Sequence, residues 1–296
     1  MLSEEMFAAL QLLAAIAVLC LASARDLRTR RVSNTFWIGL SVLGIVLLPL
    51  RIINDDAPIE YSLILIPVFA ILSDVFLDLD GDSTFSRYFP MLKYGVALAA
   101  TTALGMVWID EKYFQPLLAI PVVMMVIVLM YMFDLIRGGA DAKALISLTV
   151  LFPAYPVVAG FPLIAANETL QIIFPFSLSV LVNAAILVVF LPIVFLAKNL
   201  ARGDVRFPQA FAGYRMDIDR VAGKHVWLME RIENDQHIFY ARPRSDEDLV
   251  QELGRLRERG LTRVWVTPKI PFIVPMLAGF VLTIIAGNVL FLLFSF

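Results

Sequence analysis

The stretch Gly138-Gly139-Ala140-Asp141-Ala142-Lys143 places a carboxylate between two long apolar runs of the chain. An ionised group at such a place is costly unless it finds a partner, because a bilayer solvates charge poorly. The best candidate partner is Asp26, far upstream in Arg25-Asp26-Leu27-Arg28-Thr29-Arg30-Arg31-Val32-Ser33-Asn34. We therefore read the rest of the chain as the frame that carries these two stretches.

The composition is that of a membrane protein. The chain has 296 residues, of which 60% are hydrophobic and 17% are charged, whereas soluble domains are about 45–50% apolar and about 25% charged. Several apolar runs reach the roughly 18 residues that can span a bilayer. The sequence predicts an all-α polytopic membrane protein with about eight transmembrane helices, approximately over residues 6–24, 36–50, 61–76, 91–109, 116–136, 142–164, 172–197 and 271–296.

Basic residues predict how these helices are oriented. Arg25, Arg28, Arg30 and Arg31 follow the first run, and Lys198 and Arg202 follow the seventh, while the alternate loops are mostly acidic. Loops rich in Lys and Arg stay on the cytoplasmic side. We therefore expect a multi-pass protein of the plasma membrane with both termini outside and both aspartates at the cytoplasmic face.

A polar piece interrupts the apolar pattern before the last helix. Short strands are expected over 226–228 and 237–240 around the turn Asn234-Asp235, and over 264–266. Between them, Ser245 is expected to cap a helix that ends at Gly260. The sequence thus predicts a membrane domain over 1–197, a small cytoplasmic α+β unit over 198–269 and a final transmembrane helix over 270–296.

Two carboxylates at one face of the membrane favour peptide hydrolysis. One ionised carboxylate can activate water while a protonated one polarises the carbonyl and later protonates the amine. Close carboxylates share a proton because both cannot ionise easily. The positive end of the sixth helix would favour the ionised form of Asp141, and the negative end of the first would favour the acid form of Asp26.

The neighbours of Asp141 fit this interpretation. Gly138 and Gly139 let the backbone turn and leave space for an extended peptide beside the carboxylate. The alternative is an ordinary helix corner whose aspartate is a solvated cap. Lys143 is either an anchor at the cytoplasmic interface or a group that tunes Asp141.

At these residues the chain resembles the type IV prepilin peptidase family, in its archaeal preflagellin (archaellin) and prepilin branch. The resemblance implies that Asp26 and Asp141 are catalytic, with Asp141 in the Gly-x-Gly-Asp signature of the family. The stretch Trp265-Val266-Thr267-Pro268-Lys269-Ile270-Pro271-Phe272 also resembles a C-terminal extension of some archaeal members. The resemblance further implies substrates that carry a short basic leader before a hydrophobic helix.

Some features depart from related patterns. Ala140 stands where the signature has its second glycine, and the single cysteine excludes the paired Cys-x-x-Cys zinc domain of bacterial prepilin peptidases. Presenilin-like enzymes pair their signature with adjacent Tyr and Asp on the preceding helix, whereas Tyr131 and Asp134 are three apart. We expect Asp134 to form an ion pair with Arg137 at i+3 on a helix.

An acidic cluster follows the third apolar run. It contains Asp74, Asp78, Asp80 and Asp82. A calcium loop is disfavoured, since Phe89 stands where such a loop needs a bidentate Glu. Two interpretations stay open: a solvated acidic loop, or a set of acids that bind the basic leader of a substrate.

The sequence therefore predicts a membrane aspartic endopeptidase that removes the basic leader of archaellin and type IV pilin-like precursors. We expect no metal, no cofactor and no nucleic-acid partner, contact with membrane lipids, and an oligomeric state that the sequence leaves open. Two alternatives remain. One is a transporter or channel that uses the same acids as proton or cation sites, and the other is an inactive scaffold.

Overall fold

A computed structural model of the chain describes residues 3–77, 84–164, 168–233, 235–240 and 249–293, without the side chains of residues 84–90, 168, 292 and 293. The chain divides into two compact units. The first comprises Met1–Ala185 with Pro271–Phe296, and the second comprises Ile186–Ile270.

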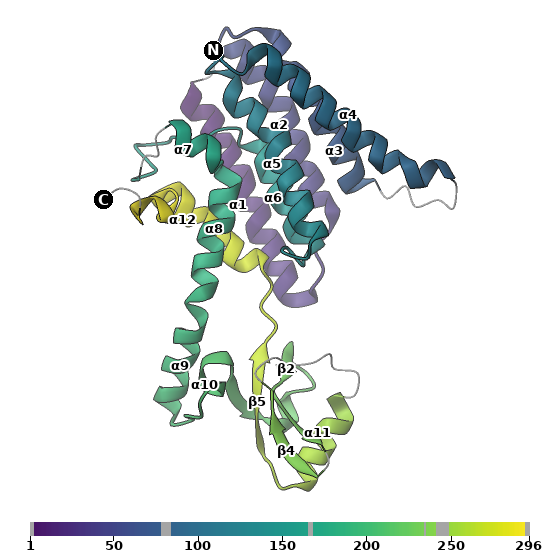
Figure 1. The fold of residues 1–296 in the computed structure, drawn as a ribbon. Coiled ribbons are helices and arrows are strands. Elements are labelled where there is room, and N and C mark those ends of the chain that lie inside the picture. The colour runs from purple at the N-terminus through teal and green to yellow at the C-terminus, as the bar shows by residue number, and fades with distance from the viewer. Residues whose placement is uncertain (1–2, 78–83, 165–167, 234, 241–248, 294–296) are drawn as a thin grey trace. The chain divides into compact units, whose positions relative to one another are not determined.

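The first unit is built of helices (Figure 1). In chain order these are α1 (Glu4–Thr29), α2 (Asn34–Asn54), the 3-10 helix η1 (Ile59–Ile64), α3 (Leu65–Phe76), α4 (Thr84–Trp108), α5 (Phe114–Met132), α6 (Gly139–Leu151), α7 (Glu168–Ile173), the start of α8 (Phe176–Val189), α12 (Ile273–Ala286) and the 3-10 helix η3 (Val289–Leu293).

The polar residues between α1 and α2 fix where these helices end and begin. Arg30 adopts the left-handed conformation, φ 56°, and its N–H donates to the carbonyl of Asp26 at 3.1 Å, which ends α1. Ser33 then caps α2 by accepting from the N–H of Thr35 at 3.3 Å. Asp26 is thereby held in the last turn of α1.

Helix α6 lies at the centre of the first unit, beside α2 and α5 (Figure 1). Every residue from Ala144 to Leu151 is buried. Gly44 of α2 allows a close approach, because a β-carbon there would lie 2.8 Å from the carbonyl oxygen of Val150. Ser147 adds polar contacts, since its hydroxyl lies 3.0 Å from the carbonyl of Trp37 and accepts from Ser41 at 3.0 Å. Helices α2 and α6 therefore run parallel in a fixed register.

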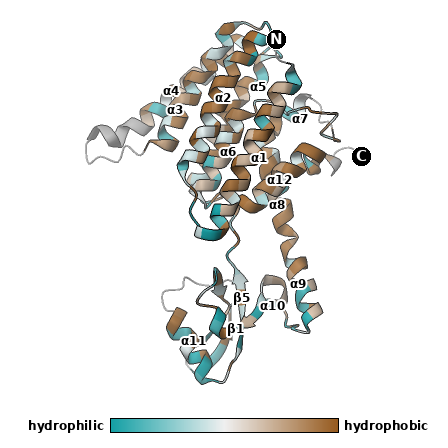
Figure 2. Ribbon diagram, turned by 180° about the vertical axis from the view of Figure 1, so that it is seen from behind, coloured by the Kyte–Doolittle hydropathy of each residue, from teal (hydrophilic) through white to brown (hydrophobic). Residues whose placement is uncertain are grey.

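Six helices in the described part of the chain are long and apolar enough to cross a membrane. They are Glu4–Thr29, Asn34–Asn54, Ile59–Phe76, Met91–Trp108, Gln115–Met132 and Phe176–Arg202, and Ile273–Ala286 is a shorter apolar helix. Large apolar side chains such as Leu13 and Met106 point outward from this unit, and apolar colour covers most of its helices (Figure 2). A mostly helical membrane protein is confirmed, whereas the predicted number of eight spans is not.

The difference is clearest after α6. We expected a helix over 142–164, but the helix ends at Leu151. Phe152 has φ −120° and ψ 82°, outside the helical region. Proline lacks an N–H and disfavours the helical conformation in the residue before it, so Pro153 ends this helix rather than bending it.

The second unit combines helices with a small antiparallel sheet. It contains α9 (Leu191–Arg202), α10 (Gln209–Ala212), β1 (Tyr214–Asp217), the 3-10 helix η2 (Ile218–Arg220), β2 (Val226–Leu228), β3 (Glu230–Glu233), β4 (Gln236–Phe239), α11 (Leu249–Glu258) and β5 (Arg263–Pro268). Strand β5 is central, with β1 and β2 on either side. Leu253 and Leu256 of α11 and Val264 and Val266 of β5 form its core.

Several predictions for this unit are confirmed. Strand β2 has its expected bounds, β4 and β5 include most of the expected residues, and Gly260 follows α11 with φ 78°. The expected pairing was wrong, because β4 forms its hairpin with β3 and β2 pairs with β5. Strands β1 and β3 were not expected, and Ser245 lies outside the described residues.

Candidate active site

The paths of α1 and α6 bring Asp26 and Asp141 to the same end of the first unit. The two helices meet at their other ends, where the Gln11 amide donates to the carbonyl of Leu151 at 2.6 Å. From Gln11 to Asp26 helix α1 rises about 22 Å, and from Leu151 back to Asp141 helix α6 spans about 15 Å. Both aspartates are half-buried.

The first turn of α6 positions Asp141. Gly138 is the N-cap residue, and its carbonyl accepts from the N–H groups of Asp141 at 3.0 Å and Ala142 at 3.1 Å. The Asp141 carboxylate folds back over this glycine, since a β-carbon on Gly138 would lie 2.0 Å from Asp141 Oδ2. Gly138 therefore leaves the space that the carboxylate occupies.

The electrostatic surroundings of Asp141 favour its protonated form. Asp141 lies outside the six candidate spans. Burial is the larger cause and the nearby charge of Asp26 is the second, and together they raise the pKa of Asp141 above the ordinary range of an aspartate. This direction is opposite to our expectation from the helix dipole, because desolvation and a like charge outweigh the helix terminus.

Among the described residues, no side chain makes a direct polar contact with the carboxylate of Asp26 or Asp141. Within the described part of the chain, the carboxylates of Asp26 and Asp141 have no hydrogen bond and no ion pair. The charge of Arg30 acts on Asp26 without a direct ion pair. Half-buried carboxylates that lack a hydrogen bond and an ion pair are costly in a membrane protein, which is typical of groups kept for chemistry rather than for stability.

Lys143 links α6, in which it lies, to α2. Its Nζ donates to Asn34 Oδ1 at 3.2 Å and lies 5.9 Å from the ring centroid of Phe76. Lys143 thus fixes the start of α6 against the start of α2, just after the loop that follows Asp26. The sequence alone gives Asn34 no role in the site, because a contact between two distant helices leaves no local signal.

The two small residues between Gly138 and Asp141 have different surroundings. A β-carbon on Gly139 would lie 3.4 Å from Tyr131 Oη, an ordinary contact. Ala140 is half-buried against the main hydrophobic core. Of the motif glycines, only Gly138 therefore has a contact that a methyl group would directly disturb.

Asp134 does not join the site in the way its spacing suggested. Helix α5 ends at Met132, and Asp134 adopts φ 57° beyond it. Among the described residues Asp134 forms no ion pair with Arg137, so the expected i+3 pair was wrong. The helical spacing on which that expectation rested is interrupted by the end of α5.

Of the acidic cluster, the structure describes only Asp74. Its carboxylate lies 3.4 Å from Lys93 Nζ and accepts a hydrogen bond from the Tyr94 hydroxyl at 2.8 Å. These contacts link α3 to α4. Asp78, Asp80 and Asp82 lie outside the described residues.

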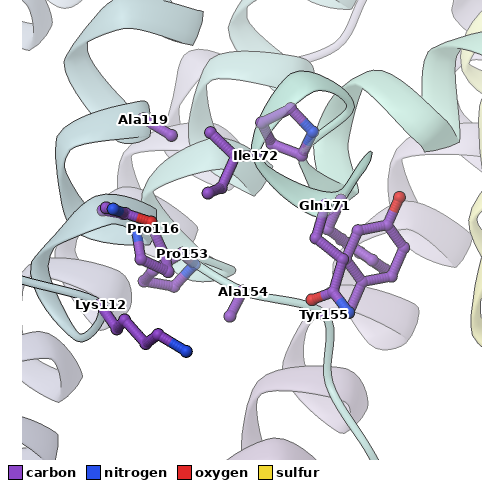
Figure 3. A pocket seen from close by; sticks show the side chains of 11 residues that line it. Lys112, Pro116, Ala119, Pro153, Ala154, Tyr155, Gln171 and Ile172 are labelled. Carbon is purple, nitrogen blue, oxygen red and sulfur yellow. The ribbon is translucent and has the colours of Figure 1, made fainter. Parts of the chain in front are cut away.

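Two cavities of the first unit lie at the opposite end from Asp141, in the part of the chain that the structure describes. They have volumes of about 220 and 250 Å³ and share Lys112, Pro116, Pro153 and Ala154 as lining residues. Figure 3 shows the first cavity, with Tyr155 and Gln171 on one side. Pro153 follows the C-terminal end of α6, whereas Asp141 is in its first turn. These cavities are therefore separate from the acid pair.

Comparison with known proteins shows that this chain is similar to archaeal peptidases. The family described as "Archaeal Peptidase A24 C-terminus Type II" matches residues 206–289. Proteins named "Preflagellin peptidase" are similar to this chain: that of Methanocaldococcus jannaschii is 28% identical over 53% of this chain and 66% of its own length. That of Methanococcus maripaludis is 28% identical over 51% and 64%, and that of Methanococcus voltae is 24% identical over 91% and 92%.

The fold is that of a mostly helical protein with six helices, among the described residues, that are long and apolar enough to cross a membrane, and Asp26 and Asp141 lie at one end of its helical unit. The matches extend over just under two thirds of the first two relatives and most of the third. Together with the C-terminal family match, they support the archaeal prepilin and preflagellin peptidase family as the family of this chain.

Proposed function

We propose that this protein is a membrane aspartic endopeptidase that removes the short basic leader of archaellin and type IV pilin-like precursors. Asp26 and Asp141 would form the catalytic pair, at the cytoplasmic face of the plasma membrane. The names of the relatives support a leader-cleaving peptidase. The positive charge of the loop after α1 supports the cytoplasmic side, since Arg28, Arg30 and Arg31 lie beside Asp26.

In the proposed reaction the two carboxylates share one proton. The ionised carboxylate takes a proton from water as the oxygen attacks the scissile carbonyl, while the protonated one donates to the carbonyl oxygen. The tetrahedral intermediate then collapses as the C–N bond breaks and the amine receives a proton. The raised pKa of Asp141 suits the role of the protonated member.

The proposed substrate has a polar leader followed by a hydrophobic helix. That helix would dock laterally against the apolar exterior of the first unit, with the leader at the aspartates. Asp78, Asp80 and Asp82 are proposed to attract the basic residues of the leader. Asp74 would contribute less, because Lys93 and Tyr94 already engage its carboxylate.

The observation that carries the proposal is the electrostatic interaction of two half-buried carboxylates that form no hydrogen bond or ion pair with the described side chains. The test is cleavage of archaellin and pilin precursors by membranes that contain the wild type, Asp26→Asn or Asp141→Asn. The matched control is Asp134→Asn, an exposed acid close to Asp141 in the chain. We expect both site variants to insert normally and lose cleavage, while the control keeps it.

Other results would point elsewhere. Cleavage by both site variants, or loss in the control alone, would refute the proposed pair. If the wild type cuts no member of a broad precursor panel, a transporter or a scaffold becomes the better interpretation.

A further inference from the structure

The second unit contains a rigid bend at residues 191–212, which we call the α9–α10 elbow. At its centre the buried Asn199 side chain donates to the carbonyls of Ala210 at 3.0 Å and Gly213 at 2.7 Å. The carbonyl of Asn199 also accepts from the N–H of Asp204 at 3.0 Å. These bonds join α9 to α10 and fix the direction in which the outer side chains of the elbow point.

The outer surface of this elbow is strongly apolar. Leu200 is 56% exposed, Phe207 is 63% exposed and Phe211 is 40% exposed. The Phe207 and Phe211 ring centroids are 5.6 Å apart, so the two aromatic side chains form one patch. Exposed apolar surface of this kind marks a site of interaction with a membrane or another protein.

The charge of the same surface selects between these two partners. Lys198, Arg202 and Arg206 are exposed, whereas the acid within residues 198–211, Asp204, is buried. Asp204 is also neutralised by Arg263, whose guanidinium lies 2.8 Å from its carboxylate. Lys198 and Arg206 also lie over rings of their own unit, Lys198 Nζ at 4.3 Å from the Tyr214 centroid and Arg206 Cζ at 3.7 Å from the Phe239 centroid. The elbow therefore carries the exposed Arg202 and two exposed aromatic rings on one short stretch, which is the combination that binds anionic lipid surfaces.

The position of the elbow in the chain agrees with a membrane partner. Helix α9 belongs to the candidate span Phe176–Arg202. Ile193 and Val194 of α9 are more than half exposed, so apolar surface continues from the span into the elbow. A segment that leaves the hydrocarbon region in this way passes through the headgroup layer before it reaches water.

We propose that the α9–α10 elbow docks on the anionic headgroup layer of the membrane. Phe207 and Phe211 would insert at the boundary between headgroups and acyl chains, and Arg202 would lie among the lipid phosphates. The start of the second unit would then be held at the membrane by the elbow in addition to the candidate span. This inference does not depend on the catalytic pair.

The test uses the full-length protein in vesicles that contain phosphatidylglycerol and nitroxide-labelled lipid. In a Cys20→Ser background, an environment-sensitive fluorophore is attached at Phe207→Cys. The matched control is Val250→Cys, on α11 of the same unit, where the side chain is 79% exposed. We expect the label at position 207 to shift to shorter wavelength and to be quenched by the lipid several-fold more strongly than the label at 250.

Equal quenching at the two positions would overturn the proposal. Shielding of position 207 in detergent, without lipid quenching in vesicles, would also overturn it and would identify a second copy or another protein as the partner. Two further experiments test the role of charge. One uses Arg202→Gln in the anionic vesicles, and the other keeps Arg202 and uses vesicles of phosphatidylcholine alone. We expect each change to reduce the quenching at 207, and quenching that is the same in neutral and anionic vesicles would refute the electrostatic part.

Discussion

Replacement of Gly138 by alanine should separate the geometry of the proposed site from the stability of the fold. A β-carbon at this position would lie 2.0 Å from Asp141 Oδ2. An ordinary carbon–oxygen contact is roughly 3.5 Å, so the carboxylate must move by about 1.5 Å. The backbone of Gly138 itself, φ −93° and ψ 116°, is open to alanine.

The expected cost therefore falls on catalysis. The atom that must give way is the end of a side chain, so we expect the free energy of unfolding to change by no more than about 1 kcal/mol, the usual scale of a helix cap. A displacement of about 1 Å in a catalytic group can lower a rate on the order of 100-fold. We expect Gly138→Ala to lower precursor cleavage by about that factor while the protein inserts normally.

The assay compares cleavage rates and melting temperatures of Gly138→Ala and Gly39→Ala. Gly39 is on the exposed side of α2, and a β-carbon there would meet no atom within 4 Å apart from its chain neighbours and the adjacent backbone of the helix. The control should therefore cut at the wild-type rate. Cleavage by Gly138→Ala at that same rate would refute our account of the Asp141 position, and an equal loss in both variants would mean that helix flexibility, not the carboxylate contact, was the cause.

Three further predictions concern pH, the α2–α6 connection and the second unit. Cleavage should fall as the pH rises through the raised pKa of Asp141, because the pair then loses its shared proton. Lys143→Met removes the hydrogen bond to Asn34, and we expect cleavage to fall up to about tenfold, the equivalent of one such bond. Glu230→Ala leaves the buried N–H of Trp265 without the carboxylate that accepts it at 2.6 Å, and should destabilise the second unit by about 1–3 kcal/mol.

Each of these three predictions has its own control or contradicting result. A rate that keeps rising into the alkaline range would contradict the shared proton. For the α2–α6 connection, Asn34→Ala should have the same effect as Lys143→Met, and the double variant should be no worse than either; additive losses would contradict a direct interaction. For the second unit, Glu233→Ala is the matched change in the same hairpin, and resistance to limited proteolysis measures both variants.

Much of the fold follows from local properties of the sequence. Apolar runs long enough to span a bilayer made this a membrane protein, and the positions of most helices could be read from them. Strand β2 and the helix end at Gly260 were likewise predictable, because a glycine with positive φ and a short apolar strand are signals within a few residues. Pro153 was a local signal for the end of α6, but the apolar run beyond it favoured a longer helix.

The motifs around Asp26 and Asp141 marked the candidate site, since carboxylates beside long apolar runs need a physical reason. Their burial and surroundings were not predictable from that pattern. Only the tertiary structure shows that the carboxylate of Asp141 folds over Gly138 and that Lys143 bonds to Asn34. Hydropathy and spacing describe one helix at a time, whereas these contacts depend on which faces of distant helices pack together and in what register.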